Sequence, residues 1–235
     1  MFKYRGPTFA KVLALGFGLA VFTVVGIGLL LEQLASESKR HQRARDDAWI
    51  AAELVKIKSG TTDSLHFYDT LNTGVLLARL NGVRGVKSLE FDLTDISDED
   101  LRLLSTLPDL ERLVIYGGSP SVKDDGLAYL SGCRKLTELK LINTQVNGPG
   151  LDVLQELPEL RYLVLDNDFA NGQVHLTVDS LQSLERLTRL RRICLIGPWF
   201  SREAVGELRR ALPDCRITTG GNWRQSPDRQ AGGAQ

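Results

Sequence analysis

The chain repeats one short apolar phrase about every 24 to 30 residues between Val86 and Ile217, and this repeat constrains the fold more than any other feature. Each copy has the form apolar-x-x-apolar-x-apolar, which places its last two apolar residues on one side of a β-strand. A period of this length predicts a solenoid, in which stacked repeats bury one continuous core. The five copies are Val86-x-x-Leu89-x-Phe91, Leu110-x-x-Leu113-x-Ile115, Leu136-x-x-Leu139-x-Leu141, Leu160-x-x-Leu163-x-Leu165 and Leu190-x-x-Ile193-x-Leu195.

A second apolar phrase follows each strand phrase after a loop. Its apolar residues recur at every third position, which places them on one face of a helix. Neither element can bury its apolar face alone, so we expect strands and helices to share one α/β core. The five copies are Leu101-x-x-Leu104-x-x-Leu107, Leu127-x-x-Leu130-x-x-Cys133, Leu151-x-x-Leu154-x-x-Leu157, Leu181-x-x-Leu184-x-x-Leu187 and Val205-x-x-Leu208-x-x-Ala211.

Residues 12–31 contain no charged side chain and predict a transmembrane helix. Twenty helical residues span about 30 Å, the thickness of the hydrocarbon core of a bilayer. A cleaved signal peptide is the alternative, but the apolar region of a signal peptide is usually only ~7–15 residues long. The best cleavage site, before Ser36, also has the bulky Gln33 at its −3 position. We therefore expect an uncleaved signal anchor that crosses the cell membrane once and contacts the lipid bilayer.

Charged residues beside this span predict its orientation. Lys11 lies directly against it at the end of an N-terminal tail, residues 1–11, whereas the basic residues on the far side begin only at Lys39. Basic residues close to a span favour the cytoplasmic side, so we expect the repeats on the extracytoplasmic side. The small-xxx-small pair Ala14 and Gly18 is compatible with a weak homo-oligomer.

The remaining sequence divides by composition. Residues 32–47 predict a charged, solvated stalk, with contact to anionic lipid headgroups as the alternative. Residues 48–85 predict an N-terminal cap with a short strand over 64–68, because a solenoid must cover the open end of its core. Residues 86–219 hold the repeats and a closing segment. Residues 220–235 have almost nothing to bury and predict a disordered tail.

The loops and the closing segment resemble the leucine-rich repeat family, in the variety of short bacterial proteins with the loop phrase T-x-I-x-D-x-G-L. Residues 94–101, 122–127 and 144–151 match this phrase, and residues 208–217 are similar to the closing segment of such arrays. The resemblance implies a leucine-rich-repeat solenoid with parallel strands on a concave face and helices on a convex face. It also implies partner binding rather than catalysis. The Asn that receptor-type repeats carry after the strand is not regular here, so their ligand geometry does not carry over.

The sequence offers no constellation for catalysis, a cofactor or a metal. Lys+Arg and Asp+Glu balance at 29 each, which gives no basic field for nucleic acid. The three histidines, His41, His66 and His175, have no neighbours that would complete a catalytic triad. A calcium site is one interpretation of the acidic residues at 95–100 and of Asp166 with Asp168. The spacing fails the EF-hand pattern, and helix N-caps explain the first group better.

The cysteines do not form an even disulfide framework. Cys133 stands where other repeats have leucine and is expected to be a buried apolar residue, and Cys215 is expected to be similar. Cys194 falls on an outward strand position and is expected to be the accessible thiol.

The strand positions that point away from the core carry the functional hypothesis. They combine an apolar and aromatic stripe with basic residues, a composition favoured at protein interfaces. We expect a non-catalytic module that binds a protein or peptide there. The alternative without a function is that these residues are strand-formers chosen for propensity and partly covered by the long loops at the rim. A second function is a structural envelope protein that self-associates through anchor and stalk. The predicted contact residues are Arg112, Val114, Tyr116, Lys140, Ile142, Tyr162, Val164, Arg192 and Ile196.

Overall fold

The computed structural model describes the backbone of residues 7–70, 72–116, 122–166, 178–197 and 201–220. Side chains are described in these ranges from Ile27 onward, except at 28, 178 and 179. The chain divides into two compact units, Met1–Arg45 and Asp46–Gln235. The predicted disordered tail lies outside the described residues from 221 onward.

The first unit contains most of helix α1, which runs from Pro7 to Lys58. The side chains from Leu29 to His41 are all exposed. In the part of the chain that the structure describes, no helix combines the length and apolar character needed to cross a membrane. The predicted span at 12–31 is helical, but its side chains at residues 12–26 and 28 lie outside the described residues.

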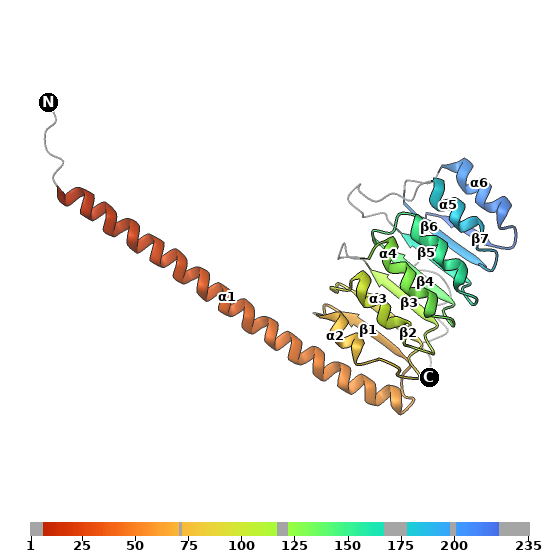
Figure 1. Ribbon diagram of the computed structural model, residues 1–235, viewed down its shortest axis with the longest axis horizontal. Coiled ribbons are helices and arrows are strands. Elements are labelled where there is room, and N and C mark those ends of the chain that lie inside the picture. Colours follow the sequence, from red (N-terminus) through yellow and green to blue (C-terminus); the bar gives the residue numbers. More distant parts are fainter. Residues whose placement is uncertain (1–6, 71, 117–121, 167–177, 198–200, 221–235) are drawn as a thin grey trace. The chain divides into compact units, whose positions relative to one another are not determined.

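The second unit is an α/β structure built on an open sheet of seven parallel strands, arranged in the order of the sequence (Figure 1). This arrangement is compatible with a solenoid, because each strand pairs only with its neighbours in the chain. The strands are β1 Ser64–Tyr68, β2 Ser88–Asp92, β3 Arg112–Tyr116, β4 Glu138–Ile142, β5 Tyr162–Asp166, β6 Arg192–Ile196 and β7 Arg216–Thr219.

The helices of the repeats form a layer on one face of this sheet (Figure 1). Two of the return segments include 3₁₀ turns, which suit apolar residues at every third position because that helix has three residues per turn. The elements are α2 Thr73–Ala78, α3 Asp98–Leu104, α4 Asp124–Leu127, η1 Ala128–Gly132, η2 Pro149–Glu156, α5 Val178–Glu185 and α6 Arg202–Ala211.

The strand register aligns the apolar residues of the repeats into buried rows. Leu89 pairs with Leu113, and the row continues through Leu139 and Leu163 to Ile193. These side chains are buried in one core with the leucines of the helical layer. The inward positions predicted from the repeat are therefore confirmed.

Both ends of the sheet extend beyond the five repeats that the sequence predicts. Strand β1, expected within the cap, pairs with β2 in the same register, Leu65 against Leu89. The last turns of α1 pack on it, with the rings of Trp49 and Phe67 5.1 Å apart and edge to face. Ile50 and Ile57 of the same helix are buried in the core. At the other end, β7 forms within the predicted closing segment and pairs with β6.

Candidate functional site

The side of the sheet opposite the helical layer, here called the strand face, brings together the predicted contact residues. The parallel register places them in three rows that run across β3 to β6. In the order β3 to β6, the rows are Arg112, Glu138, Tyr162 and Arg192; Val114, Lys140, Val164 and Cys194; and Tyr116, Ile142, Asp166 and Ile196.

The apolar members of these rows form a second hydrophobic cluster, separate from the helix-backed core. Val114 and Val164 have no exposed surface, and Ile142, Cys194 and Ile196 are also buried. Tyr116 and Tyr162 pack against this cluster and are half-buried. The sequence predicted that these side chains share one surface, with partial cover by the rim loops as the alternative. The complete burial of Val114 and Val164 was not predicted.

The prediction that Cys194 is the accessible thiol is wrong. Its side chain is buried within the strand-face cluster, and it is a free cysteine. Burial raises the pKa of the Cys194 thiol, because the thiolate loses its hydration there. Cys215 is half-buried and Cys133 is buried in the helix-backed core.

A small group of charges lies among these apolar side chains. The Nζ of Lys140 lies 2.5 Å from Glu138 Oε1, and Arg112 Nε lies 3.3 Å from the same oxygen. Lys140 is 6 % exposed, which is unusual for a lysine on a sheet surface. The Nζ of Lys140 is also 5.1 Å from the centre of the Tyr162 ring, and the guanidinium of Arg192 is 5.3 Å from it.

The Tyr162 ring therefore lies within cation–π distance of two basic side chains. Burial raises the pKa of the Tyr162 hydroxyl, with smaller contributions from Cys194 and Glu138. Such a group of charges orients side chains and can recognise a polar partner.

The first two strands form a different, more exposed part of the strand face. His66 pairs with Glu90 in the register, and His66 Nε2 lies 3.9 Å from Glu90 Oε1. Tyr68 pairs with Asp92, and its side chain is 59 % exposed. The rings of His66 and Tyr68 lie edge to face, 6.0 Å apart. These residues are not among the contact residues predicted from the sequence, because the strand over 64–68 is expected within a cap. The 24-residue spacing of Leu65 and Leu89 is the signal that could have identified them.

The acidic residues of the loops hold neighbouring repeats together. Asp98 accepts a hydrogen bond from the backbone N–H of Lys123 at 2.8 Å, and Asp124 accepts from Gly148 and Gly150 at 3.2 and 3.1 Å. Within the α3 loop, the Ser97 side chain and Asp100 form the expected N-terminal capping box.

The calcium interpretation finds no support in these contacts. Among the described residues, no group of three or more His, Cys, Asp or Glu side chains is placed to hold a metal ion. Asp168 and His175 lie outside the described residues, and His41 lies in α1 with an exposed side chain.

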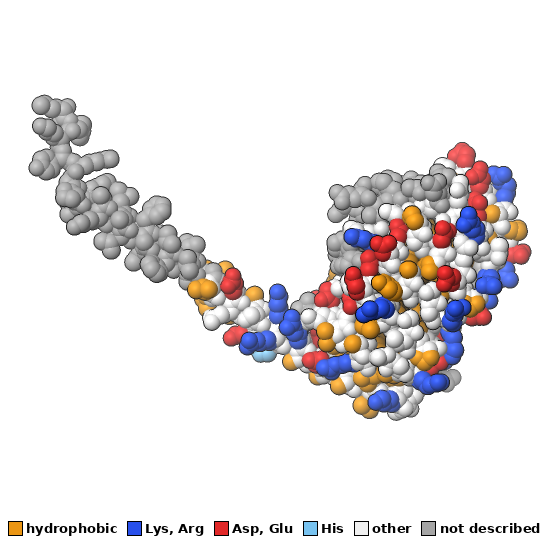
Figure 2. Space-filling model, viewed as in Figure 1, with side chains coloured by type: hydrophobic (Ala, Val, Ile, Leu, Met, Phe, Trp, Pro, Cys, Tyr) orange, Lys and Arg blue, Asp and Glu red, His pale blue; other side chains and the backbone are white. Residues whose placement is uncertain are grey.

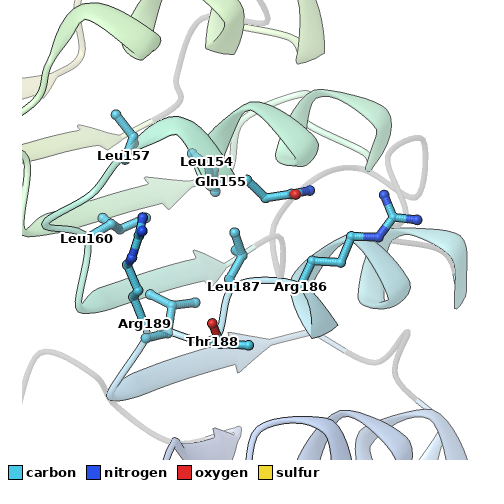
Figure 3. Close-up of a pocket in the computed structure, with 9 residues that line it drawn as sticks. Leu154, Gln155, Leu157, Leu160, Arg186, Leu187, Thr188 and Arg189 are labelled. Carbon is cyan, nitrogen blue, oxygen red and sulfur yellow. The ribbon is translucent and has the colours of Figure 1, made fainter.

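The helix-bearing face has the character of a solvated surface. Basic and acidic side chains alternate over it, with apolar side chains scattered between them (Figure 2). A cavity of about 220 Å³ opens between η2 and the turn that follows α5 (Figure 3). Leucines of the core form its floor, including Leu154 and Leu187, while Arg186 and Gln155 stand at its rim. The cavity lies in the groove between two repeats and brings no reactive groups together.

The comparisons with known proteins leave the site to be interpreted from its own geometry. The sequence matches no protein-family model, and no curated protein matches it.

Proposed function

We propose that the second unit is a leucine-rich-repeat solenoid. Its support is the coincidence of the sequence period with the sheet: each apolar phrase becomes one strand, and each strand pairs with the next in register. The resemblance of the loop phrases supports the same assignment, since Asp98 and Asp124 each bind the backbone of the next repeat.

We propose further that the strand face binds a protein or peptide and that the chain is not an enzyme. The observation that carries this proposal is the gathering of tyrosine and arginine side chains on the side of the sheet without helices. Tyr68, Tyr116, Tyr162, Arg112 and Arg192 all belong to this face. Tyrosine and arginine are the residue types that most often dominate the binding energy of protein interfaces.

Exposure indicates where a partner would make its first contact. Tyr68 at the end of β1 and Leu93 directly after β2 are more than half exposed, and His66 of β1 is exposed too. The acidic side chains of Glu90 and Asp92 lie among them and are half-buried. A partner with a basic or hydrogen-bonding edge beside an apolar side chain suits this region best.

The membrane anchor completes the proposal. The uncharged residues 12–31 would hold the chain in a cell membrane by a single pass, with the tail 1–11 in the cytoplasm and the repeats on the extracytoplasmic side. The support is the length of the uncharged run and the position of Lys11 beside it.

Site-specific photo-crosslinking tests the binding surface in the membrane. A photoreactive phenylalanine analogue at position 68 is expected to capture a discrete partner protein in cells. The same analogue in place of Tyr129, an exposed tyrosine on the helix-bearing side in η1, is the matched control and should not capture it. Equal capture from both positions would contradict binding on the strand face.

The self-associating alternative gives a different result in the same experiment. If the chain acts as a structural envelope protein, the adduct would contain a second copy of this chain. That adduct would disappear when residues 1–45 are deleted, because the anchor and stalk would hold the copies together, whereas Ile50 and Ile57 of the core would stay in place.

A further inference from the structure

The residue directly after a strand of this sheet has a positive φ at every such position that the structure describes. The φ angle is 49° at Asp69 after β1, 54° at Asn143 after β4 and 71° at Gly220 after β7. Glycine adopts a positive φ without a steric penalty, and Asn and Asp tolerate it better than other residues do. The sequence has one of these three residue types directly after every strand except β2.

Leu93, directly after β2, is the exception. Its φ is 52°, so a bulky apolar residue occupies a backbone conformation in which its Cβ is crowded. Its side chain is 55 % exposed, so burial in the core does not compensate for this strain. The other strands show that the fold accepts Asn, Asp or Gly at this position. Stability of the fold therefore does not explain the leucine, and strained residues cluster where ligands or partners bind.

A second exposed apolar side chain lies close to Leu93. Tyr68 pairs with Asp92 in the register of β1 and β2, and its side chain is 59 % exposed. The backbone N–H of Asp69 donates to Asp92 O at 3.1 Å, so the two segments still lie side by side where the strands end. Neighbouring strands are about 4.8 Å apart, which brings Tyr68 and Leu93 within reach of a single partner.

The charges around this exposed pair are acidic. Asp69 directly follows the tyrosine, Asp92 directly precedes the leucine, and Asp95 comes two residues later. The side chains of Asp69 and Asp95 are exposed, and that of Asp92 is half-buried. Residues 59–78 and 88–101, which contain β1, β2 and the turns that follow them, have no Lys or Arg. A partner that carries basic side chains complements this surface.

We propose that Leu93 is the central apolar contact for the partner of the strand face, and that this partner is a protein segment with an apolar cleft flanked by Lys or Arg. The inference rests on the function proposed above. Leu93 enters the cleft, Tyr68 packs beside it, and the basic side chains pair with Asp92 and the neighbouring carboxylates.

The stability of the fold and the affinity for the partner then make opposite demands on position 93. Asparagine relieves the backbone strain but leaves the cleft of the partner unfilled. Methionine keeps the apolar contact and also keeps the strain. The two substitutions therefore separate a contact residue from a residue that only tolerates its position.

Thermal unfolding of the full chain in detergent measures the strain. Leu93→Asn should raise the unfolding temperature by about 2–4 °C, because the exposed leucine contributes little burial and asparagine tolerates the positive φ better. Leu93→Met should leave the unfolding temperature within about 1 °C of the unaltered chain, since both side chains are apolar and both are strained there.

Photo-crosslinking in cells measures the contact. In chains that carry the photoreactive phenylalanine analogue at position 68, Leu93→Asn should lower the yield of the partner adduct about tenfold, as expected for a central interface residue. Leu93→Met should keep most of the yield. Val75→Ala removes a comparably exposed apolar side chain from α2 and should leave the yield unchanged. Asp92→Lys should lower the yield, because it repels a basic partner.

Each contrary result overturns a different step. An unchanged adduct yield in Leu93→Asn would show that Leu93 is not the contact, while partner binding on the strand face would stand. An unchanged or lower unfolding temperature in Leu93→Asn would remove the strain from which the contact is inferred. A higher yield in Asp92→Lys would assign an acidic partner. The absence of any adduct from position 68 in the otherwise unaltered chain would contradict the proposed function, and the contact with it.

Discussion

The two faces of the sheet are made by the same strands, yet they are built on different principles. From β1 to β6 the helix-side rows contain only leucine, isoleucine and phenylalanine, and a helix or helical turn follows each of these strands. The strand face is buried over β3 to β6 as well, but there Lys140, Glu138 and Asp166 lie among valines and isoleucines. Burial on one face is thus part of the repeat, and burial on the other is not.

The difference between the two faces shows which part of the burial is specified by the repeat. Each repeat supplies its own helix, so the apolar residues on the helix side recur with the period of the chain. On the strand face the residue types change from strand to strand, as in the row Val114, Lys140, Val164 and Cys194. The strand face is for this reason more varied in sequence and better suited to recognise a specific partner.

The largest expected effect comes from the helix-side rows. Leu139→Ala removes a fully buried side chain between Leu113 and Leu163 and should lower the free energy of unfolding by about 2–5 kcal/mol. Val164→Ala, on the neighbouring position of the strand face, removes two methyl groups from the smaller strand-face cluster and should cost about 1.5 kcal/mol. Urea unfolding of both variants measures the difference. An equal or larger loss for Val164→Ala would break the comparison.

A substitution where two neighbouring repeats are in contact should give the next largest loss in the free energy of unfolding. A Cβ on Gly150 would lie 2.5 Å from the backbone oxygen of Asp124, so Gly150→Ala forces two neighbouring repeats apart. We expect a loss of about 1–3 kcal/mol in urea unfolding. Gly206→Ala in α6 is the control, since a Cβ there meets no atom within 4 Å and alanine favours a helix by up to about 1 kcal/mol. A neutral Gly150→Ala would show that the repeats are not in close contact at this joint.

Removal of Lys140 and removal of Glu138 from the strand face should change the free energy of unfolding by different amounts. Lys140→Met leaves Glu138 paired with Arg112 and should change the free energy of unfolding by less than about 1 kcal/mol. Glu138→Leu leaves two cations without this carboxylate and should cost about 1–2 kcal/mol more. Thermal unfolding at neutral pH measures which of the two variants is the less stable. The reverse order would mean that Lys140 itself holds the strand face together.

The smallest expected effect is on the stability of the fold at acidic pH. Burial raises the pKa of Asp95, but hydrogen bonds from Thr73 and Asn72 outweigh it, so the pKa lies below the ordinary value of 3.8. A carboxyl group with a lowered pKa stabilises the fold above its ordinary pKa and loses this contribution as the pH falls through the folded-state value. Stability measured from pH 5 down to pH 2.5 should therefore fall less steeply in Asp95→Asn than in the unaltered chain. Parallel curves for the two proteins would exclude this role of Asp95.

The helix-side core could be predicted residue by residue, because its pattern has a period that the sequence displays. The residues that lie on the strand face could also be predicted from the sequence, since a strand turns alternate side chains to opposite sides. The exposure of that face could not be predicted, as the error over Cys194 shows. Exposure depends on how side chains of neighbouring strands, which are distant in the sequence, pack against one another.

The ends of the sheet and the contacts between neighbouring repeats were also only partly predictable from the sequence. Strand β1 continues the sheet, although its phrase Leu65-x-Phe67 lacks the leading apolar residue of the other copies. Asp98 and Asp124 belong to a recognisable loop phrase, but their partners are backbone N–H groups of the next repeat. A carboxylate in a loop has many alternative partners, and only the stacking of repeats selects one.

The sequence by itself determined the period, the α/β alternation and the two rows of leucines that join strand to helix. These depend on local periodicity and on apolar burial, which neighbouring residues are sufficient to specify. Only the tertiary structure decided that Val114 and Val164 are withdrawn from water, that Lys140 is buried beside Glu138, and that Tyr68 remains exposed. Burial on the strand face is a property of contacts between distant parts of the chain, and no local pattern of residues encodes those contacts.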